Sequence, residues 1–205
     1  MKTIKTILFW IMSCTWGIIM TLIGLLTALG LIIAGNKPKR FGYGFYFEVG
    51  KEWGGVSLGP VFLTEEFADN SLKQHEAGHG VQNIWFGPFM PFVIGIPSMI
   101  RYWFREICGT KTQTERYRFV FRWFGILILL GVILTVLCAF TFSTLIGFIG
   151  FIVGAGITVY AIILLIWLIE SEIPKYEIYI PAYNDIWFER SASKIGAKRW
   201  QTYKI

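Results

Sequence analysis

The chain has 205 residues, of which 55% are hydrophobic and only 16% are charged, and its mean hydropathy is +0.57. A soluble globular domain carries roughly a quarter charged residues, so this composition argues against one and indicates a single-domain integral membrane protein. The net charge of +6 suits anionic lipid headgroups, and no nucleic-acid recognition motif accompanies it; we expect membrane lipid, and no nucleic acid, as a partner. The three cysteines include no C-x-x-C pair, so no disulfide framework is expected.

The first apolar segment covers residues 7–34. A membrane helix needs about 20 apolar residues, so this segment is long enough for one tilted span. Lys2 and Lys5 precede it, as basic residues do in a signal peptide, but the apolar core of a signal peptide has about 7–15 residues. We therefore expect a retained first transmembrane helix.

Residues 43–63 combine glycines with aromatic and β-branched residues. The pattern predicts two strands, 43–50 and 56–63, with a turn between them and a break at Gly59-Pro60. We interpret the pair as a β-hairpin outside the bilayer. Its role is either to cap the membrane domain or to offer an edge that pairs with an extended peptide, and the capping role is preferred.

A helix is expected over residues 71–86. Its start fits a capping box from Ser71 to Gln74, in which side chains satisfy two backbone N–H groups reciprocally. Its end is set by Gly87-Pro88, because proline disfavours helical conformation at the residue before it.

The sequence His75-Glu76-Ala77-Gly78-His79 lies on this helix and contains the only two histidines of the chain. Residues i and i+4 lie one turn apart on one helix face, so both imidazoles can bind one ion from the same side. The glutamate after the first histidine falls on the neighbouring surface, where it can hold and deprotonate an attacking water. The motif therefore predicts a zinc site with His75 and His79 as ligands and Glu76 as the catalytic base.

Zinc requires a third protein ligand, and a catalytic site leaves the fourth position to water. The chain has no third histidine, so this ligand must be a carboxylate or a cysteine. Glu189 is the best candidate, because residues 185–199 predict a second helix with Asn184 or Asp185 as its cap. The alternatives are Asp185, Glu172, Glu106 and Cys108.

Combined with a glutamate on a downstream helix, the motif resembles the gluzincin metallopeptidases. The chain is still more similar to a group of small, uncharacterised bacterial membrane proteins with an H-E-x-G-H motif. The stretches that carry this similarity are residues 53–59, 75–83, 86–92, 96–98, 101–106 and 185–189. The resemblance implies a metallopeptidase-like zinc site with Glu189 as the third ligand, and it implies no particular substrate.

One position departs from the gluzincin pattern. Gluzincins often carry an aspartate one turn after the ligand glutamate, where it orients a ligand histidine, and here that position is Ser193. A serine can accept a hydrogen bond but has no charge, so the histidine is expected to be a less basic ligand. The departure bears on catalysis more than on zinc binding.

Three more apolar stretches predict the topology. Residues 122–143 and 147–169 are each long enough to span a membrane, with a short break between them. Residues 87–104 contain three prolines and are expected to form a re-entrant or interfacial segment packed against protein. His75 and Glu189 can share one ion only if this segment does not cross the bilayer.

Basic residues indicate the orientation. Apart from Lys2 and Lys5, all of them lie on the side that bears the motif, which favours a multi-pass protein of the cell membrane with its site on the cytoplasmic face. The two lysines before the first span favour the opposite orientation.

The sequence thus predicts a mainly α integral membrane protein with about three transmembrane helices, and a zinc-dependent hydrolysis of peptide bonds in an unidentified peptide or protein. The alternative is a membrane scaffold or partner-binding protein with a structural zinc ion, although such sites are usually closed and rich in cysteine. A transporter is disfavoured, because residues 125–169 contain no acidic or basic side chain that would mark an ion path.

Overall fold

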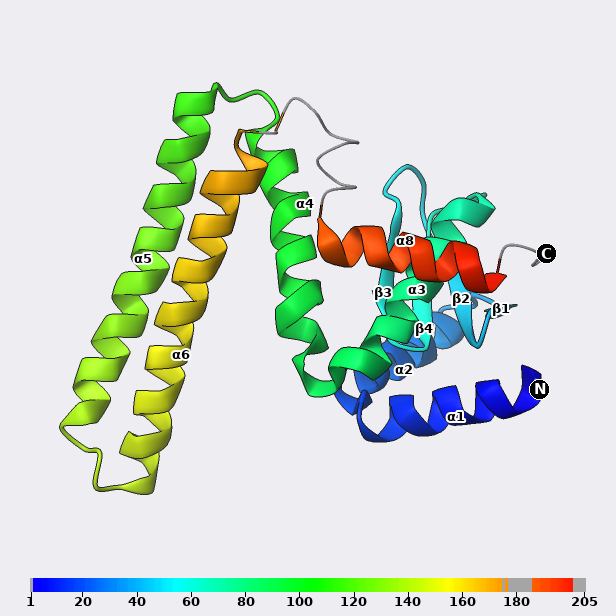
Figure 1. Cartoon of the computed structure of the whole chain (residues 1–205), viewed down its shortest axis with the longest axis horizontal. Helices are drawn as coiled ribbons and strands as arrows, with labels where there is room; N and C mark the ends of the chain where they lie inside the picture. Colours follow the sequence, from blue (N-terminus) through cyan, green and yellow to red (C-terminus); the bar gives the residue numbers. More distant parts are fainter. Residues whose placement is uncertain (1, 175, 177–185, 201–205) are drawn as a thin grey trace. The chain divides into compact units, whose positions relative to one another are not determined.

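The computed structural model describes residues 2–174, 176 and 186–200, and they are mainly helical with one small sheet (Figure 1). They form two compact units, one comprising Met1–Ser98 and Tyr183–Ile205 and the other Met99–Ala182. The first unit contains the sheet and the H-E-x-x-H helix, and the second contains a long antiparallel pair of helices.

The segment predicted as one first span consists of two helices. Helix α1 (Lys2–Thr15) and helix α2 (Ile18–Ile33) meet at an angle of 100°. At the bend, the Thr21 hydroxyl and the Asn83 amide both donate to the carbonyl oxygen of Gly17, at 2.9 and 3.2 Å. These polar contacts stabilise an interrupted helix, and the apolar composition of the segment does not reveal them.

Four short strands form the sheet, in the order β1-β2-β4-β3. They are β1 (Lys39–Phe41), β2 (Gly44–Glu48), β3 (Gly55–Leu58) and β4 (Val61–Thr64). Strands β2 and β4 are parallel, and the other two pairs are antiparallel. Strands β1 and β3 are therefore the edges of the sheet.

The predicted hairpin between residues 43–50 and 56–63 is wrong in its pairing. The second predicted strand is itself a hairpin, because the turn at Gly59-Pro60 folds β4 back onto β3. Gly59 has a φ of +75°, which a two-residue hairpin turn with glycine at its first central position requires. β4 then lies beside β2 in parallel, with Phe45 opposite Val61.

Helix α3 (Asn70–Phe86) packs between the sheet and helix α8 (Trp187–Trp200), which Figure 1 shows in red crossing α3. The two helices approach closely, since a Cβ at Gly78 would overlap the backbone of Ala192 and one at Gly196 would overlap that of Gln74. The buried side chains of this unit come from α1, the sheet, α3 and α8, and include Phe9, Phe41, Tyr46, Phe62, Ala77, Val81 and Trp200.

After α3 the chain turns sharply. It passes through a 3-10 turn, η1 (Gly87–Phe89), and a π-helical turn, η2 (Pro91–Gly95), into helix α4 (Ile96–Cys108). The two helical arms meet at 115°. The bend falls among the prolines that predicted an irregular segment over residues 87–104.

The second unit contains α5 (Gln113–Ala139), α6 (Leu145–Trp167) and the π-helical turn η3 (Leu168–Glu172). α5 and α6 run side by side in opposite directions (Figure 1). α5 begins nine residues before the predicted span of 122–143, because Thr112 and Glu115 form a capping box that starts the helix within a charged sequence.

Two to four segments of the described chain are long and apolar enough to span a membrane. Gln113–Ala139 and Leu145–Glu172 are each long and apolar enough to cross a membrane. The bent pairs α1–α2 and α3–α4 also qualify if each pair is taken as one broken span. The expected three spans fall within this range.

Candidate metal centre

Helix α3 places the two histidines on one face, one turn apart. The helix begins at Asn70, and its cap is Asp69, whose carboxylate accepts a hydrogen bond from the backbone N–H of Leu72 at 2.8 Å. The predicted cap at Ser71 is therefore wrong by two residues. Asp69 is at least as good a cap as serine, and the position of the histidines on the helix is unaffected.

Glu189 of α8 reaches the two histidines. Its Oε2 atom lies 3.2 Å from Nε2 of His75 and 3.1 Å from Nε2 of His79, and the two Nε2 atoms are 3.1 Å apart. All three side chains are buried, and Glu189 is only 1% exposed. The structure thus brings together the three residues that the sequence predicted as ligands.

The dimensions of this group fit a small divalent ion. A tetrahedral ion with ligands at about 2.0–2.1 Å holds its ligand atoms about 3.3 Å apart. The three distances between the ligand atoms of His75, His79 and Glu189 run from 3.1 to 3.2 Å. The group can therefore hold a metal ion without a large rearrangement.

The hydrogen bonds of Gln82 determine which nitrogen of neutral His79 carries the hydrogen. The Gln82 amide nitrogen donates to the carbonyl oxygen of Phe188 at 2.8 Å, so its Oε1 atom is the one that faces Nδ1 of His79, at 2.7 Å. An amide oxygen only accepts, and Nδ1 must carry the hydrogen. Nε2 of neutral His79 then has its lone pair toward His75 and Glu189, as a metal ligand requires.

Ser193 occupies the place expected from the sequence. Its hydroxyl lies 2.8 Å from Nδ1 of His75. It can therefore orient the His75 ring by a hydrogen bond, and it does so without a charge.

Glu189 is also held from the opposite side. The Ser98 hydroxyl, in the first turn of α4, donates to Oε1 of Glu189 at 2.8 Å, which leaves Oε2 to the histidines. In the metal-free protein, burial raises the pKa of Glu189, but hydrogen bonds with His75 and His79 and the charge of these side chains outweigh burial and hold that pKa well below its usual range. Glu189 is therefore an anion at neutral pH.

In the metal-free protein, protonation of His79 competes with metal binding. Burial lowers the pKa of His79, but the hydrogen bond and charge of Glu189 outweigh this effect and raise the pKa from 6.5 to about 8. Below that pH, in the absence of metal, His79 is protonated and paired with Glu189. A metal ion must displace this proton, because only neutral imidazole is a ligand.

Glu76 lies next to the ligand group but is directed toward the sheet. It is 5% exposed, and a Cβ at Gly55 of β3 would lie 2.8 Å from its Oε1 atom. Burial raises the pKa of Glu76, an effect that the nearby His75 and His79 partly offset. A buried carboxylate with a raised pKa, beside two histidines that could hold a metal ion, has the properties of a general base.

The described alternatives for the third ligand do not belong to the group of His75 and His79. Glu172 accepts hydrogen bonds from Arg101 at 3.0 Å and Arg105 at 3.2 Å. Cys108 is fully buried in an apolar cluster, and Glu106 is exposed. Asp185 lies outside the described residues. Within the described part of the chain, His75, His79 and Glu189 form the one group of three or more potential ligands.

Sequence reasoning missed Gln82 and Ser98. Gln82 follows His79 by three residues, and helical spacing could have identified it as a neighbour on the same face. Ser98 lies on another helix, after two turns of irregular helix, and no pattern in the sequence connects it with Glu189.

If the group holds zinc, replacing Ser98 with alanine is expected to weaken zinc binding by about 10–100-fold, because loss of a hydrogen bond to a ligand typically has this effect. Ser71→Ala, an exposed position in α3, is the matched control and should bind zinc as tightly as the wild type. Competition with a chelator of known affinity measures both variants. Equal affinity in Ser98→Ala and wild type would show that this hydrogen bond does not position Glu189.

Comparisons of this chain with protein-family models, with curated proteins and with solved structures find no match.

Proposed function

We propose that this chain is a membrane-anchored zinc metallopeptidase of the HExxH type. The observation that carries the proposal is the closely spaced group of His75, His79 and Glu189, with the buried carboxylate of Glu76 directly after His75 on the same helix. The resemblance to gluzincins and to small bacterial membrane proteins supports the same assignment.

Zinc is the ion that this donor set suits best. Two imidazoles and one carboxylate are a common ligand set of catalytic zinc, with the fourth position left to water or substrate. When bound, zinc supplies a Lewis acid that polarises a carbonyl oxygen and lowers the pKa of a water molecule.

The chain's own residues perform the proton transfers. Glu76 takes a proton from a water molecule while the oxygen of that water forms a bond to the carbonyl carbon of the peptide. It then delivers that proton to the amine nitrogen as the carbon–nitrogen bond breaks. The raised pKa of Glu76 suits both steps, since the same group must accept and return a proton near neutral pH.

The sheet offers a place for an extended peptide. β3 is an edge strand, and its first residue, Gly55, lies against Glu76. Peptides commonly bind by adding a strand to an exposed edge. A peptide paired with β3 would run past the Glu76 carboxylate, which favours the peptide-binding role of this segment over a role as a cap.

The test is cleavage of peptides by the purified full-length protein in detergent. We expect new peptide termini, detected by mass spectrometry of a mixed peptide library, in the presence of zinc. Removal of the metal with a chelator should abolish cleavage, and added zinc should restore it. Cleavage that persists after complete metal removal would refute the proposal.

One observation favours the alternative of a structural zinc ion in a scaffold. All three ligands are buried, as they are in closed structural sites. The two functions differ in the effect of chelation on folding. A structural ion predicts a large drop in the unfolding temperature without any peptide cleavage by the zinc-loaded protein, whereas the peptidase requires cleavage.

We further propose that the protein is a multi-pass protein of the cell membrane with its site on the cytoplasmic face. Support comes from the two to four apolar helices and from the basic residues on the motif side. A single cysteine at Lys111, in a chain whose own cysteines are changed to serine, should resist a membrane-impermeant maleimide in intact cells and react after lysis. Labelling in intact cells would reverse the orientation.

A further inference from the structure

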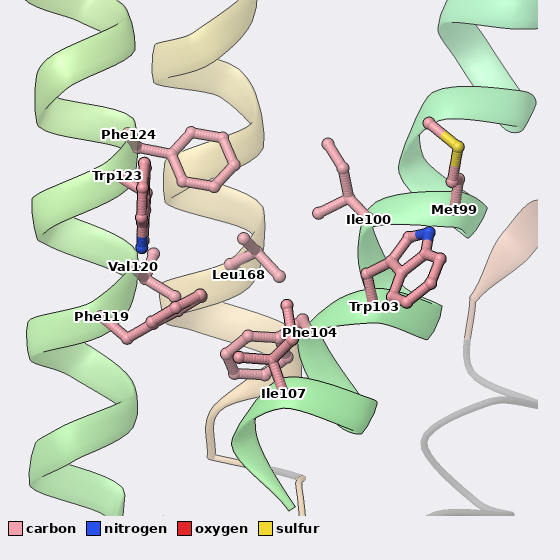
Figure 2. A pocket seen from close by; sticks show the side chains of 10 residues that line it. All are labelled: Met99, Ile100, Trp103, Phe104, Ile107, Phe119, Val120, Trp123, Phe124 and Leu168. Atoms are coloured by element: carbon pink, nitrogen blue, oxygen red, sulfur yellow. The ribbon is translucent and has the colours of Figure 1, made fainter.

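An apolar pocket of about 190 Å³ lies in the second unit, between α4, α5 and the start of η3, which continues α6 (Figure 2). Its inner wall is buried, since Val120 and Leu168 are each 1% exposed and Phe104 is 4% exposed. Its outer wall is open, because Trp103 and Trp123 are each 56% exposed. The pocket thus opens at the surface of the unit and has no charged side chain in its lining.

The size of the pocket suits a hydrocarbon group. An apolar cavity of about 150 Å³ in another protein binds benzene, so a cavity somewhat larger can take several methylene groups. Such a cavity is not a good site for water, which needs two or more polar partners. The lining therefore selects an apolar ligand.

The position of the pocket along the two helices indicates what kind of apolar ligand it binds. On α5, the pocket lies where the charged first turns end and the uninterrupted apolar stretch from Gly125 begins. In η3, which continues the antiparallel helix α6, the acidic residues Glu170 and Glu172 lie two and four residues after Leu168 of the pocket. Both helices change from apolar to charged at this level, as helices do at the boundary between acyl chains and headgroups.

Two basic residues are the sequence neighbours of residues that line the pocket. Arg118 and Arg122 are exposed, and they immediately precede Phe119 and Trp123, which line the pocket. The two arginines are one turn apart on a single face of α5. Arginine binds phosphate through paired N–H donors, and its long side chain can reach from an apolar surface to a headgroup.

We propose that this pocket is a specific site for an anionic phospholipid, with part of one acyl chain in the pocket and the phosphate at Arg118 and Arg122. Trp103 and Trp123 lie at the opening of the pocket. Tryptophan is common at the level of the lipid headgroups, so these two residues support a position of the opening at that level. The proposal does not depend on the metal centre, which lies in the first unit.

Native mass spectrometry of the full-length protein, released from an uncharged detergent, tests the site. The probes are dioleoyl phosphatidylglycerol and dioleoyl phosphatidylcholine, which have the same chains and differ in charge. We expect one lipid bound per chain, with the anionic lipid about tenfold tighter, because each basic residue near a headgroup contributes to binding.

Two variants separate the parts of the site. Ile100→Trp fills the pocket and should weaken binding of both lipids by about tenfold, while Ile133→Trp, an exposed control on α5 outside the pocket, should not. Arg118→Gln with Arg122→Gln should remove the preference for the anionic lipid, while Lys37→Gln with Arg40→Gln, exposed in the first unit, should keep it. Circular dichroism checks folding, and Ile107→Trp, at the opening, replaces Ile100→Trp if that variant does not fold.

Three results would overturn the proposal. The first is unchanged binding of the anionic lipid to both pocket-filling variants. The second is equal affinity of the wild type for the two lipids. The third is an effect of the pocket-filling variants on peptide cleavage or on dimer formation with lipid binding unchanged, which would make the pocket a site for substrate or for a second copy.

Discussion

Replacing Glu189 with glutamine is expected to remove nearly all zinc from the purified protein, from about one ion per chain to a small fraction of that. The amide has almost the shape of the carboxylate and can keep the contact with Ser98. The amide lacks the negative charge that faces both histidines. Because the two histidines are neutral as ligands, this charge is the only negative charge that the three ligands offer a divalent ion. Loss of a hydrogen-bond partner of a ligand already lowers metal affinity by about 10–100-fold, so loss of the charge of the ligand itself should lower it further.

Elemental analysis after dialysis against a low concentration of chelator measures this effect. Glu106→Gln is the matched control, since Glu106 is exposed and was itself a candidate ligand in the sequence. It should bind zinc as the wild type does. Full zinc content in Glu189→Gln, together with loss in His79→Ala, would keep the histidines as ligands and assign the third position to another residue.

Replacing Glu76 with glutamine is expected to leave zinc bound and to lower the rate of peptide cleavage by about 10²–10⁴-fold, the usual contribution of a general base. Glu76 is directed toward Gly55 of β3 and is not one of the three ligands, so its charge is not needed to hold the ion. On the proposed mechanism, the substitution removes only the group that accepts the proton of the attacking water.

Stability should change in the opposite direction from activity. Burial raises the pKa of Glu76, so ionisation of this carboxylate in the folded protein is unfavourable, and an uncharged amide avoids that cost. We expect the unfolding temperature of Glu76→Gln to equal or exceed that of the wild type. Glu66→Gln, on the surface, is the control for a loss of negative charge.

The combination of results identifies the function. Retained zinc, retained stability and lost cleavage in Glu76→Gln would support the peptidase. Wild-type cleavage rates in Glu76→Gln would mean that another group is the base and that the proposed mechanism is wrong.

Features with a local cause were predictable from the sequence. The spacing of His75 and His79 specifies one helix face whatever the rest of the chain does, and Gly87-Pro88 ends that helix at Phe86 by local sterics. The apolar segments predicted at 122–143 and 147–169 lie mostly in two helices that are long and apolar enough to span a membrane. Length and composition alone decide whether a segment meets this condition.

Features that depend on distant partners were not predictable. Strand pairing is one of them, since the alternation of residues in β2 and β4 is the same for parallel and antiparallel neighbours. The bend after α1 is another, because it depends on Asn83 from α3, which is far away in the sequence.

The candidate site also has a part that was predictable from the sequence and a part that was not. The sequence by itself determined the two histidines and the glutamate between them, and it ranked Glu189 first among several carboxylates without excluding the others. Only the tertiary structure decided that Glu189 completes the group, because the close crossing of α3 and α8 at Gly78 and Gly196 depends on packing between segments more than 100 residues apart. The contacts of Gln82 and Ser98 that orient the ligands were likewise decided by that packing, since a hydrogen bond between distant segments leaves no periodic pattern in either one.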